Sequence, residues 1–445
     1  MIPTYRKQFN HEFSPEKYGQ LKEILKEKSG VEPSFRISES PMFLTKKFET
    51  QLLDASESII DQIKALPPEN LQKAIPENCR VPNDTDQPHF FTIDFGICRG
   101  ANGEIEPQLI ELQAFPSLYA FQRIFEDTFC EIYPFLSEIR NKMPDETFKN
   151  YLKELIVGNE DPENVILLEI FPEKQKTAID FVLTEKLLGI KTVCLTKIKK
   201  DGKKLFYDNN GRLTEIKRIY NRVIFDELDK IPNLNTEFDF REDVDVTWVT
   251  HPNWFFKISK FLLPLLQHQF VPKSYFLHEF PEDENLDNFV LKPLFSFAGS
   301  GVNLNPTKEI TKAIEDKENY ILQRKVQYEP VFEDIHGDFS KAEIRLLYIW
   351  RENDERPILL ENLGRMTKAA MVNVDFNKKD AIWIGSSNAF LRKNNFKTDI
   401  QWKKARLFRS LKRKEILQEE EIYCPCGSKY FYGSFSSGVH SPLFF

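Results

Sequence analysis

The chain has 445 residues and a formal net charge of −7 at pH 7; 41% of its residues are hydrophobic and 29% are charged. This composition is typical of a globular protein of two or three domains, and the negative charge argues against nucleic acid as a partner. Because the first residues lack a hydrophobic signal core and no apolar run reaches the roughly 18 residues of a membrane span, we expect a cytoplasmic protein with no membrane partner.

The first third of the chain is predicted to be helical, with one hairpin inside it. Apolar residues recur at helical spacing near the N-terminus, and a stretch rich in Pro, Asn and Asp follows. Two alternating strands then flank a turn that contains Gly100 and Gly103. The expected elements are helices at 15–28 and 47–65, an exposed connection at 67–88, strands at 90–98 and 108–115, and helices within 117–156.

From residue 164 the pattern changes to strand, helix and strand. An apolar run at 165–170 is followed by a helix at 174–188 that ends at Gly189 and by a strand at 190–195, which is typical of a βαβ unit in a parallel sheet. The remaining expected elements are a turn at 208–211, a strand at 216–224, a helix at 254–268, strands at 289–292, 320–323, 342–350 and 357–363, and a charged helix at 401–421 ahead of an irregular tail.

A lysine followed by a glycine loop is the most informative local feature. An apolar strand ends at Lys292, and the loop after it contains Gly299 and Gly301. A lysine is a point cation suited to phosphate, and glycines let backbone N–H groups approach phosphate oxygens. The strand at 320–323 could hold a base edge through its backbone. Since the sequence contains no G-x-x-x-x-G-K-[ST] motif, these features predict a nucleotide site other than a Walker loop.

The hairpin at 90–115 brings acidic residues together. Glu111 and Gln113 are two apart on one strand and share a face, and the partner strand can place Asp94 beside them. Two carboxylates and an amide oxygen form an all-oxygen site of the kind that Mg²⁺ prefers when it also binds phosphates. The pattern alone is equally compatible with an amphipathic hairpin whose polar face is solvated.

Together these segments resemble the ATP-grasp ligases, in the circularly permuted arrangement of the glutathionylspermidine synthetase-like group. The run TIDF…GEIEPQLIELQAFPSL resembles the strand pair that closes an ordinary ATP-grasp domain, but here it precedes the lysines. HPNWFFKISKFLLPLL resembles the segment of the first ATP lysine, FVLKPLFSFAGSGV the second lysine with its loop, YILQRKV the adenine linker and EIRLLYIW a nucleotide-facing strand. The resemblance covers roughly residues 90–390; Gln113 replaces the usual Asn, and Thr92 stands where an arginine often precedes the metal aspartate.

The resemblance implies an α/β (α+β) chain with a circularly permuted ATP-grasp fold, a βαβ pre-ATP-grasp domain and a helical N-terminal extension. The expected segments are a helical N-terminal region at 1–88, metal-binding strands and helices of the core at 89–156, the βαβ domain at 157–253, the lysine and glycine-loop part of the core at 254–400, and a charged helix and tail at 401–445.

The resemblance also implies a role for individual residues. The implied metal ligands are Asp94, Glu111 and Gln113; the implied ATP-binding residues are Lys260, Lys292, Ser296, Gly299, Ser300, Gly301, Gln323 and the backbone around Val326; and the implied catalytic residues are Lys292 and Arg345. The candidates for holding an anionic substrate are Arg222 and Arg365, and Asn373 is a further candidate for the cleft. Lys257 competes with Lys260 for the first lysine position, and a structural ion pair is an equal alternative for Arg345.

The activity that the resemblance implies is Mg-dependent ligation of a carboxylate to an amine at the expense of ATP, through an acyl phosphate. The expected substrates are a small carboxylate and a small amine, such as an amino acid, a peptide or a polyamine. One alternative is a non-catalytic nucleotide-binding or scaffold protein with a drifted ATP-grasp core. Another is an ATP-dependent phosphotransferase, which would leave a stable phosphorylated product.

Overall fold

The structure is a computed structural model that describes residues 2–140, 143–225, 228, 230–231, 234–296, 299–369 and 381–391. By its internal contacts the chain divides into two units, Met1–Lys393 and Asn394–Phe445, and the first unit is described below. Asn373 and the predicted charged helix at 401–421 lie outside the described residues. Within the described part of the chain, no helix combines the length and the apolarity that a membrane crossing requires.

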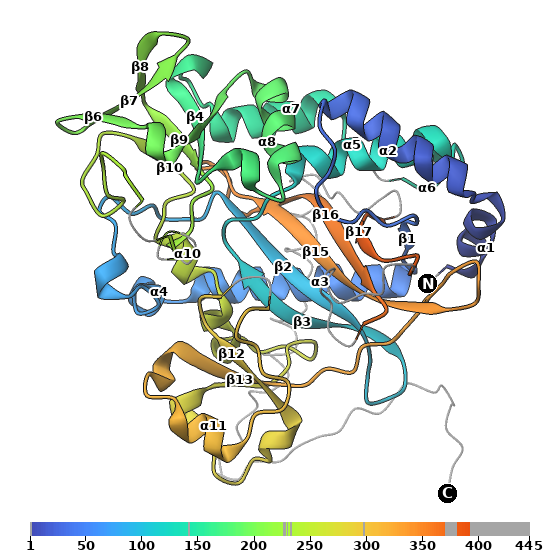
Figure 1. Ribbon diagram of the computed structural model, residues 1–445. Coiled ribbons are helices and arrows are strands. Elements are labelled where there is room, and N and C mark those ends of the chain that lie inside the picture. The colour runs from blue at the N-terminus through green and yellow to red at the C-terminus, as the bar shows by residue number, and fades with distance from the viewer. Residues whose placement is uncertain are drawn as a thin grey trace, which may run out of the picture. The chain divides into compact units, whose positions relative to one another are not determined.

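The centre of the first unit is a six-stranded sheet that joins an early hairpin to late strands. Its order is β17-β16-β15-β2-β3, and β14 pairs with β15. Figure 1 shows blue β2 lying beside orange β15, so segments far apart in the sequence share one sheet. The strands are β2 (Phe90–Arg99), β3 (Ile105–Gln113), β14 (Phe332–Glu333), β15 (Phe339–Ile349), β16 (Ile358–Thr367) and β17 (Gly385–Ser387).

The two hairpins predicted in this sheet are confirmed. β2 pairs antiparallel with β3, and β15 pairs antiparallel with β16. Both pairs carry apolar residues on one face, which are buried in the main hydrophobic core, as the alternation of their sequences predicts. A short parallel pair, β1 (Met42–Phe43) with β18 (Ala389–Phe390), also ties the N-terminal region to the end of the described chain.

Helices from the first third of the chain pack around this sheet. The predicted helices at 15–28 and 47–65 are confirmed as α2 (Pro15–Ser29) and α3 (Lys46–Ala65). Ser14 caps the first of these, and Gly30, at φ 81°, ends it in the left-handed conformation that glycine adopts readily. The other helices of this part are α1 (Pro3–Glu12), α4 (Pro68–Gln72), α5 (Tyr119–Ile132), α6 (Leu136–Ile139) and α7 (Asp145–Ile156).

The predicted βαβ unit is confirmed inside a four-stranded parallel sheet of order β10-β9-β4-β5. Helix α8 (Ala178–Leu188) ends at Gly189 (φ 75°) and connects β4 to β5. The strands are β4 (Val165–Glu169), β5 (Lys191–Cys194), β9 (Arg218–Asn221) and β10 (Thr247–Val249), and a separate sheet contains β6 (Lys199–Asp201), β7 (Lys204–Asn209) and β8 (Arg212–Ile216).

A small antiparallel sheet carries the lysine strand, with β12 and β13 at the lower left of Figure 1. Its order is β11-β13-β12, and it has its own small apolar cluster of Leu277, Phe289, Leu291 and Leu322. Its elements are β11 (Ser274–Phe276), β12 (Phe289–Pro293) and β13 (Tyr320–Arg324), and α11 (Lys308–Ala313) lies between the last two in the chain. Short 3-10 helices occur at Glu77–Cys79, Pro162–Asn164, Pro172–Lys174, Leu195–Lys197, Lys260–Leu265, Leu277–Glu279, Leu286–Asn288 and Lys317–Asn319.

The predicted single helix at 254–268 is wrong. The structure has α10 (Trp254–Lys257) and then a 3-10 helix at Lys260–Leu265. Ser259 between them is extended (φ −151°, ψ −171°), and its side chain accepts a hydrogen bond from Phe261 N. A serine that bonds to the backbone two residues on favours such a break, and Pro264 would also disrupt a continuous helix.

Candidate functional site

Charged side chains form two adjacent rows across the middle of the central sheet. In the first row Asp94 on β2 lies opposite Glu111 on β3 and opposite Arg345 on β15. In the second row Glu343 on β15 lies opposite Arg365 on β16 and opposite Gly96 on β2. Residues directly opposite each other share a face of the sheet, so both rows point the same way. The early hairpin and the late hairpin therefore build one charged cluster.

Asp94 is fully buried at the centre of this cluster and is held by two arginines. The Nε of Arg345 lies 2.8 and 3.0 Å from the two carboxylate oxygens, and its Nη2 lies 2.6 Å from Oδ2. The Nη2 of Arg365 also donates to Oδ2, at 2.5 Å. Such paired, charge-assisted contacts are strong and directional, so they fix both guanidinium groups.

Glu111 lies between the arginines of the central sheet and the lysine of the 3-10 helix. Its Oε2 is 3.8 Å from Lys260 Nζ, and its Oε1 is 3.8 Å from Arg345 Nη2. The amide of Gln113 donates to Glu111 Oε1 at 2.7 Å. Burial alone would raise the pKa of Glu111, but the surrounding lysines and arginines outweigh burial and hold that pKa below its usual value.

Lys292 joins the small sheet to the edge strand of the central sheet. Its Nζ donates to Ile110 O at 3.2 Å and to Gln323 Oε1 at 2.5 Å. Gln323 is itself buried, and its Nε2 donates to Leu109 O at 3.1 Å. Burial lowers the pKa of Lys292 to about 8, partly opposed by Glu111. The side chain of Gln323 is thus directed at the lysine and at β3.

The two candidate lysines of the 254–268 segment point to different partners. Lys260 is 5% exposed, and its Nζ donates to Ser296 O at 2.6 Å. Lys257 is 4% exposed, its Nζ lies 2.6 Å from Asp84 Oδ2, and it sits 4.4 Å from the centre of the Trp254 ring. The break at Ser259 directs the two lysine side chains to different partners. The structure therefore brings Lys260, and not Lys257, to the charged cluster.

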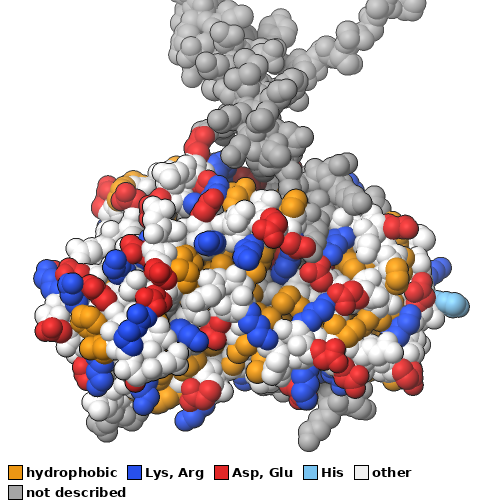
Figure 2. Space-filling model, turned by 90° about the horizontal axis from the view of Figure 1, so that it is seen from above, with side chains coloured by type: hydrophobic (Ala, Val, Ile, Leu, Met, Phe, Trp, Pro, Cys, Tyr) orange, Lys and Arg blue, Asp and Glu red, His pale blue; other side chains and the backbone are white. Residues whose placement is uncertain are grey.

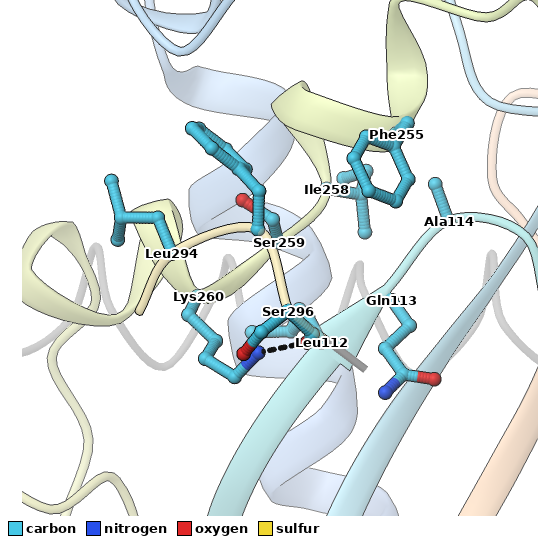
Figure 3. Close-up of a pocket in the computed structure, with 10 residues that line it drawn as sticks. Leu112, Gln113, Ala114, Phe255, Ile258, Ser259, Lys260, Leu294 and Ser296 are labelled. Carbon is cyan, nitrogen blue, oxygen red and sulfur yellow. Dashed lines mark hydrogen bonds between the residues drawn. The ribbon is translucent and has the colours of Figure 1, made fainter. Parts of the chain in front are cut away.

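An open pocket lies between the end of β3 and the segments 255–260 and 294–296, as Figure 3 shows. It is lined by Leu112, Gln113, Ala114, Phe255, Ile258, Ser259, Lys260, Leu294, Phe295 and Ser296. In this view Lys260 meets Ser296, and Gln113 projects from the end of β3. The hydroxyl oxygen of Ser296 is buried and has no hydrogen-bond partner among the described residues. It is a polar atom available to a ligand.

The glycine loop after β12 has the backbone that the sequence predicts. Gly299 and Gly301 have φ values of 76° and 72°, in the left-handed region that favours glycine. A side chain at Gly301 would place its Cβ 2.7 Å from Pro293 Cγ, so only glycine fits there without a shift. Ser300 between them is exposed, and residues 297 and 298 lie outside the described residues.

The other predicted residues lie at the margins of the cluster. Val326 is half-buried beyond β13, where the chain then pairs with the end of β2 through Arg99 N and Gln327 O. Arg222 donates from Nη1 to Pro116 O at 2.7 Å, which fixes the turn after β3. Its Nε is buried without a partner among the described residues. Arg222 therefore supports the turn that follows the strand of Glu111.

Sequence reasoning missed Glu343 and Tyr328. Glu343 is 5% exposed; its Oε2 lies 2.9 Å from Arg365 Nη2, and its Oε1 accepts a hydrogen bond from the Tyr328 hydroxyl. Burial raises the pKa of Glu343, and Arg365 partly opposes this. Tyr328 lies over Gly96, where an added Cβ would be 2.8 Å from its ring. The spacing of Glu343 and Arg345, two apart on an apolar strand, is the signal that could have revealed Glu343.

The predicted set of three metal ligands does not fit a metal ion in this arrangement. Among the described residues there is no group of three or more His, Cys, Asp or Glu side chains suited to a metal ion. The oxygens of Asp94 accept hydrogen bonds from Arg345 and Arg365, so a metal ion there would compete with two guanidinium groups. Glu111 and Gln113 are adjacent, but they bond to each other.

The molecular face in Figure 2 shows Lys and Arg side chains interspersed with Asp and Glu side chains, and it offers no broad basic surface.

Comparison with known proteins gives a likeness of fold. No protein-family model matches the sequence, and no curated protein matches it. Among solved structures, the chain is similar to a glutathione synthetase-like effector from Globodera pallida in its apo form, with a TM-score of 0.54 and 11% sequence identity. The likeness covers 84% of this chain and 96% of that chain. A likeness at this identity concerns the fold alone, and it agrees with a mixed α/β, ATP-grasp-like architecture.

Proposed function

We propose that this protein is an ATP-dependent ligase that joins a carboxylate to an amine, with a circularly permuted ATP-grasp core. The observation that carries the proposal is the junction of Lys292 and Lys260 with the β2–β3 hairpin. Lys292 donates to the backbone of β3, and Lys260 lies 3.8 Å from Glu111. The resemblance of the motifs and the fold shared with a glutathione synthetase-like protein support it.

In the proposed reaction the chain positions ATP and neutralises its charge. An oxygen of the substrate carboxylate attacks the γ-phosphorus, the bond to the β-phosphate oxygen breaks, and ADP leaves. The amine then attacks the acyl phosphate, the amide C–N bond forms, and inorganic phosphate and a proton are released. This chemistry asks the protein for orientation and electrostatic stabilisation, and it needs no side-chain nucleophile.

The residues of the cluster have distinct proposed tasks. Lys260 and Lys292 would bind phosphate oxygens as point cations, and the loop Gly299–Gly301 would offer its backbone N–H groups. Arg345, fixed by Asp94, would face the developing acyl phosphate. Because the set Asp94, Glu111 and Gln113 does not fit a metal ion in this arrangement, no step is assigned to a protein-bound magnesium ion.

The test is ATP-dependent ADP release in the presence of mixed carboxylates and amines, with mass spectrometry of the products. We expect ADP, phosphate and a new amide from the native protein, and loss of all three in the Lys292→Ala variant. Lys257→Ala, which removes a lysine directed at Asp84, is the matched control and should retain turnover. ATP binding without ADP release across a broad substrate screen would overturn the ligase proposal.

A second candidate function is non-catalytic nucleotide binding. The observation that favours it is the engagement of Asp94, the residue that the resemblance assigns to the metal, by two arginines. A binding protein would show ATP affinity that depends on Lys260 and Lys292 while releasing no ADP with any pair of substrates. The assay above therefore separates the two candidates.

A further inference from the structure

We propose that Asp94 is a positioning residue that presents Arg345 and Arg365 to the nucleotide phosphates, and that this protein binds ATP without a divalent cation. The inference rests on the proposed function, because it concerns how the same site meets the triphosphate. It departs from the role that the motif resemblance gives to Asp94.

The contacts of Asp94 compete with a metal ion, because three of the four fall on Oδ2 and one falls on Oδ1. A carboxylate offers about four acceptor positions. Arg345 and Arg365 make four donor contacts to the Asp94 oxygens, at distances from 2.5 to 3.0 Å. Mg²⁺ demands oxygen ligands at about 2.0–2.1 Å in near-octahedral geometry, so an ion at Oδ2 would have to displace a guanidinium group. Asp94 is fully buried within the sheet, and displacement would leave buried cations without their partner.

The cluster around Asp94 carries more cations than carboxylates. Its cations are Lys260, Lys292, Arg345 and Arg365, and its carboxylates are Asp94, Glu111 and Glu343. With all seven groups ionised, the cluster has an excess of one positive charge. Such a site attracts a triphosphate directly and favours the metal-free form, which carries more negative charge than the magnesium complex.

The geometry also presents the arginines in a form suited to phosphate. Arg345 uses Nε and Nη2 on Asp94, so this carboxylate does not engage its Nη1. Arg365 contacts Asp94 and Glu343 through Nη2, and its Nε is buried without a partner among the described residues. A fixed guanidinium group with an unpartnered, buried N–H is a preorganised donor for an anionic oxygen.

Glu111 is the competing carboxylate. A single carboxylate together with phosphate oxygens is sufficient for many magnesium sites, so Glu111 could in principle hold the ion. Its oxygens, however, lie within 3.8 Å of Lys260 and Arg345, and one accepts from Gln113. If Glu111 held a magnesium ion, ATP binding would require magnesium, and the requirement would disappear in Glu111→Gln. Our inference predicts no such requirement.

The experiment measures the dissociation constant of ATP by calorimetry with the full chain, in excess Mg²⁺ and in EDTA. We expect the two constants of the native protein to agree within about threefold, and Glu111→Gln to leave their ratio unchanged. Asp94→Asn releases both guanidinium groups from their fixed positions, so it should weaken binding at least about tenfold under both conditions. Arg365→Lys keeps the charge but loses the planar fork, and it should also weaken both. It replaces Asp94→Asn as the test if that variant does not fold.

Each outcome decides one claim. If removal of Mg²⁺ weakens ATP binding of the native protein more than about tenfold, a metal-held triphosphate is established and the inference fails. The proposed function survives that result. If ATP binds under neither condition, the proposed function fails, and the inference fails with it. A magnesium requirement that vanishes in Asp94→Asn would also overturn the inference, because Asp94 would then be the metal ligand.

Discussion

The two lysines of the 254–268 segment provide the sharpest test of the site. Lys257 and Lys260 are three residues apart and equally buried, at 4% and 5% exposure. They differ in their partners, because Lys257 pairs with Asp84 whereas Lys260 meets Ser296 O and Glu111. Replacing each with Met keeps most of the apolar stem and removes the charge. We expect Lys260→Met to weaken ATP binding and Lys257→Met to leave it unchanged.

The expected magnitudes follow from these contacts. A hydrogen bond from a charged group contributes about 1.5–3 kcal/mol, so loss of the Lys260 ammonium from a phosphate should raise the dissociation constant of ATP by roughly 10- to 150-fold. Removing Lys257 leaves the Asp84 carboxylate, whose side chain is 22% exposed, without its cation. Since that carboxylate retains some hydration, we expect a loss of about 1–3 kcal/mol in unfolding free energy, below the range for a fully buried pair.

The assay combines calorimetric titration with ATP and urea denaturation of both variants and the native protein. We expect a different loss in each variant: Lys260→Met loses ATP affinity, and Lys257→Met loses stability. Equal losses of ATP affinity in the two variants would refute it, because the break at Ser259 would then not separate the two side chains. Unchanged affinity in Lys260→Met would refute the placement of the triphosphate.

Three further predictions rest on single groups. Because burial lowers the pKa of Lys292 to about 8 from 10.5, the unfolded chain binds more protons than the folded chain above pH 8. In urea denaturation, the unfolding free energy of the native protein should therefore rise relative to that of Lys292→Met from about pH 8 to 10. Burial, with Glu126 nearby, raises the pKa of Glu361 to about 8 from 4.5. The unfolding free energy of the native protein should therefore fall relative to that of Glu361→Gln between about pH 5 and 8, and a difference that stays constant with pH would contradict this. Gly301→Ala should weaken ATP binding in a titration, because its Cβ would meet Pro293 at 2.7 Å. Gly103→Ala, with φ 79° and no neighbour within 4 Å, should cost only the backbone strain of about 1–2 kcal/mol and leave affinity unchanged.

Much of the sheet architecture could be predicted from local pattern. The β2–β3 and β15–β16 hairpins follow from alternating apolar residues, which indicate strands of period two. The βαβ unit follows from an apolar run, a helix that ends at Gly189 and a second strand. These signals are contained in short stretches of sequence, so no knowledge of the tertiary structure is needed to read them.

The partners of Asp94 could not be predicted, because they depend on long-range register. Arg345 is 251 residues away, and a shift of one residue in the pairing of β2 with β15 would turn its side chain to the other face. The contacts of Gln323 could not be predicted for a similar reason. Its strand was predicted correctly, but its side chain meets Lys292 and the backbone of β3, and neither contact is visible in the local pattern.

The break at Ser259 shows a different limit. Apolar residues continue through 254–268, so hydrophobic pattern alone favours one helix. The serine side chain bonds to the backbone at Phe261, and the extended backbone at Ser259 redirects the chain. Local hydrogen bonding of this kind competes with helix formation and decides which lysine reaches the site.

The measurement that tests the central claim most directly is a crystal structure of the protein with a non-hydrolysable ATP analogue. The claim is that the β2–β3 hairpin and the lysine strand β12 share one triphosphate. We predict phosphate oxygens at hydrogen-bonding distance, roughly 3 Å, from the ammonium groups of Lys260 and Lys292, with the guanidinium groups of Arg345 and Arg365 still bound to Asp94. A triphosphate bound elsewhere on the protein, with both lysines keeping their present contacts to Ser296 and Gln323, would contradict the claim.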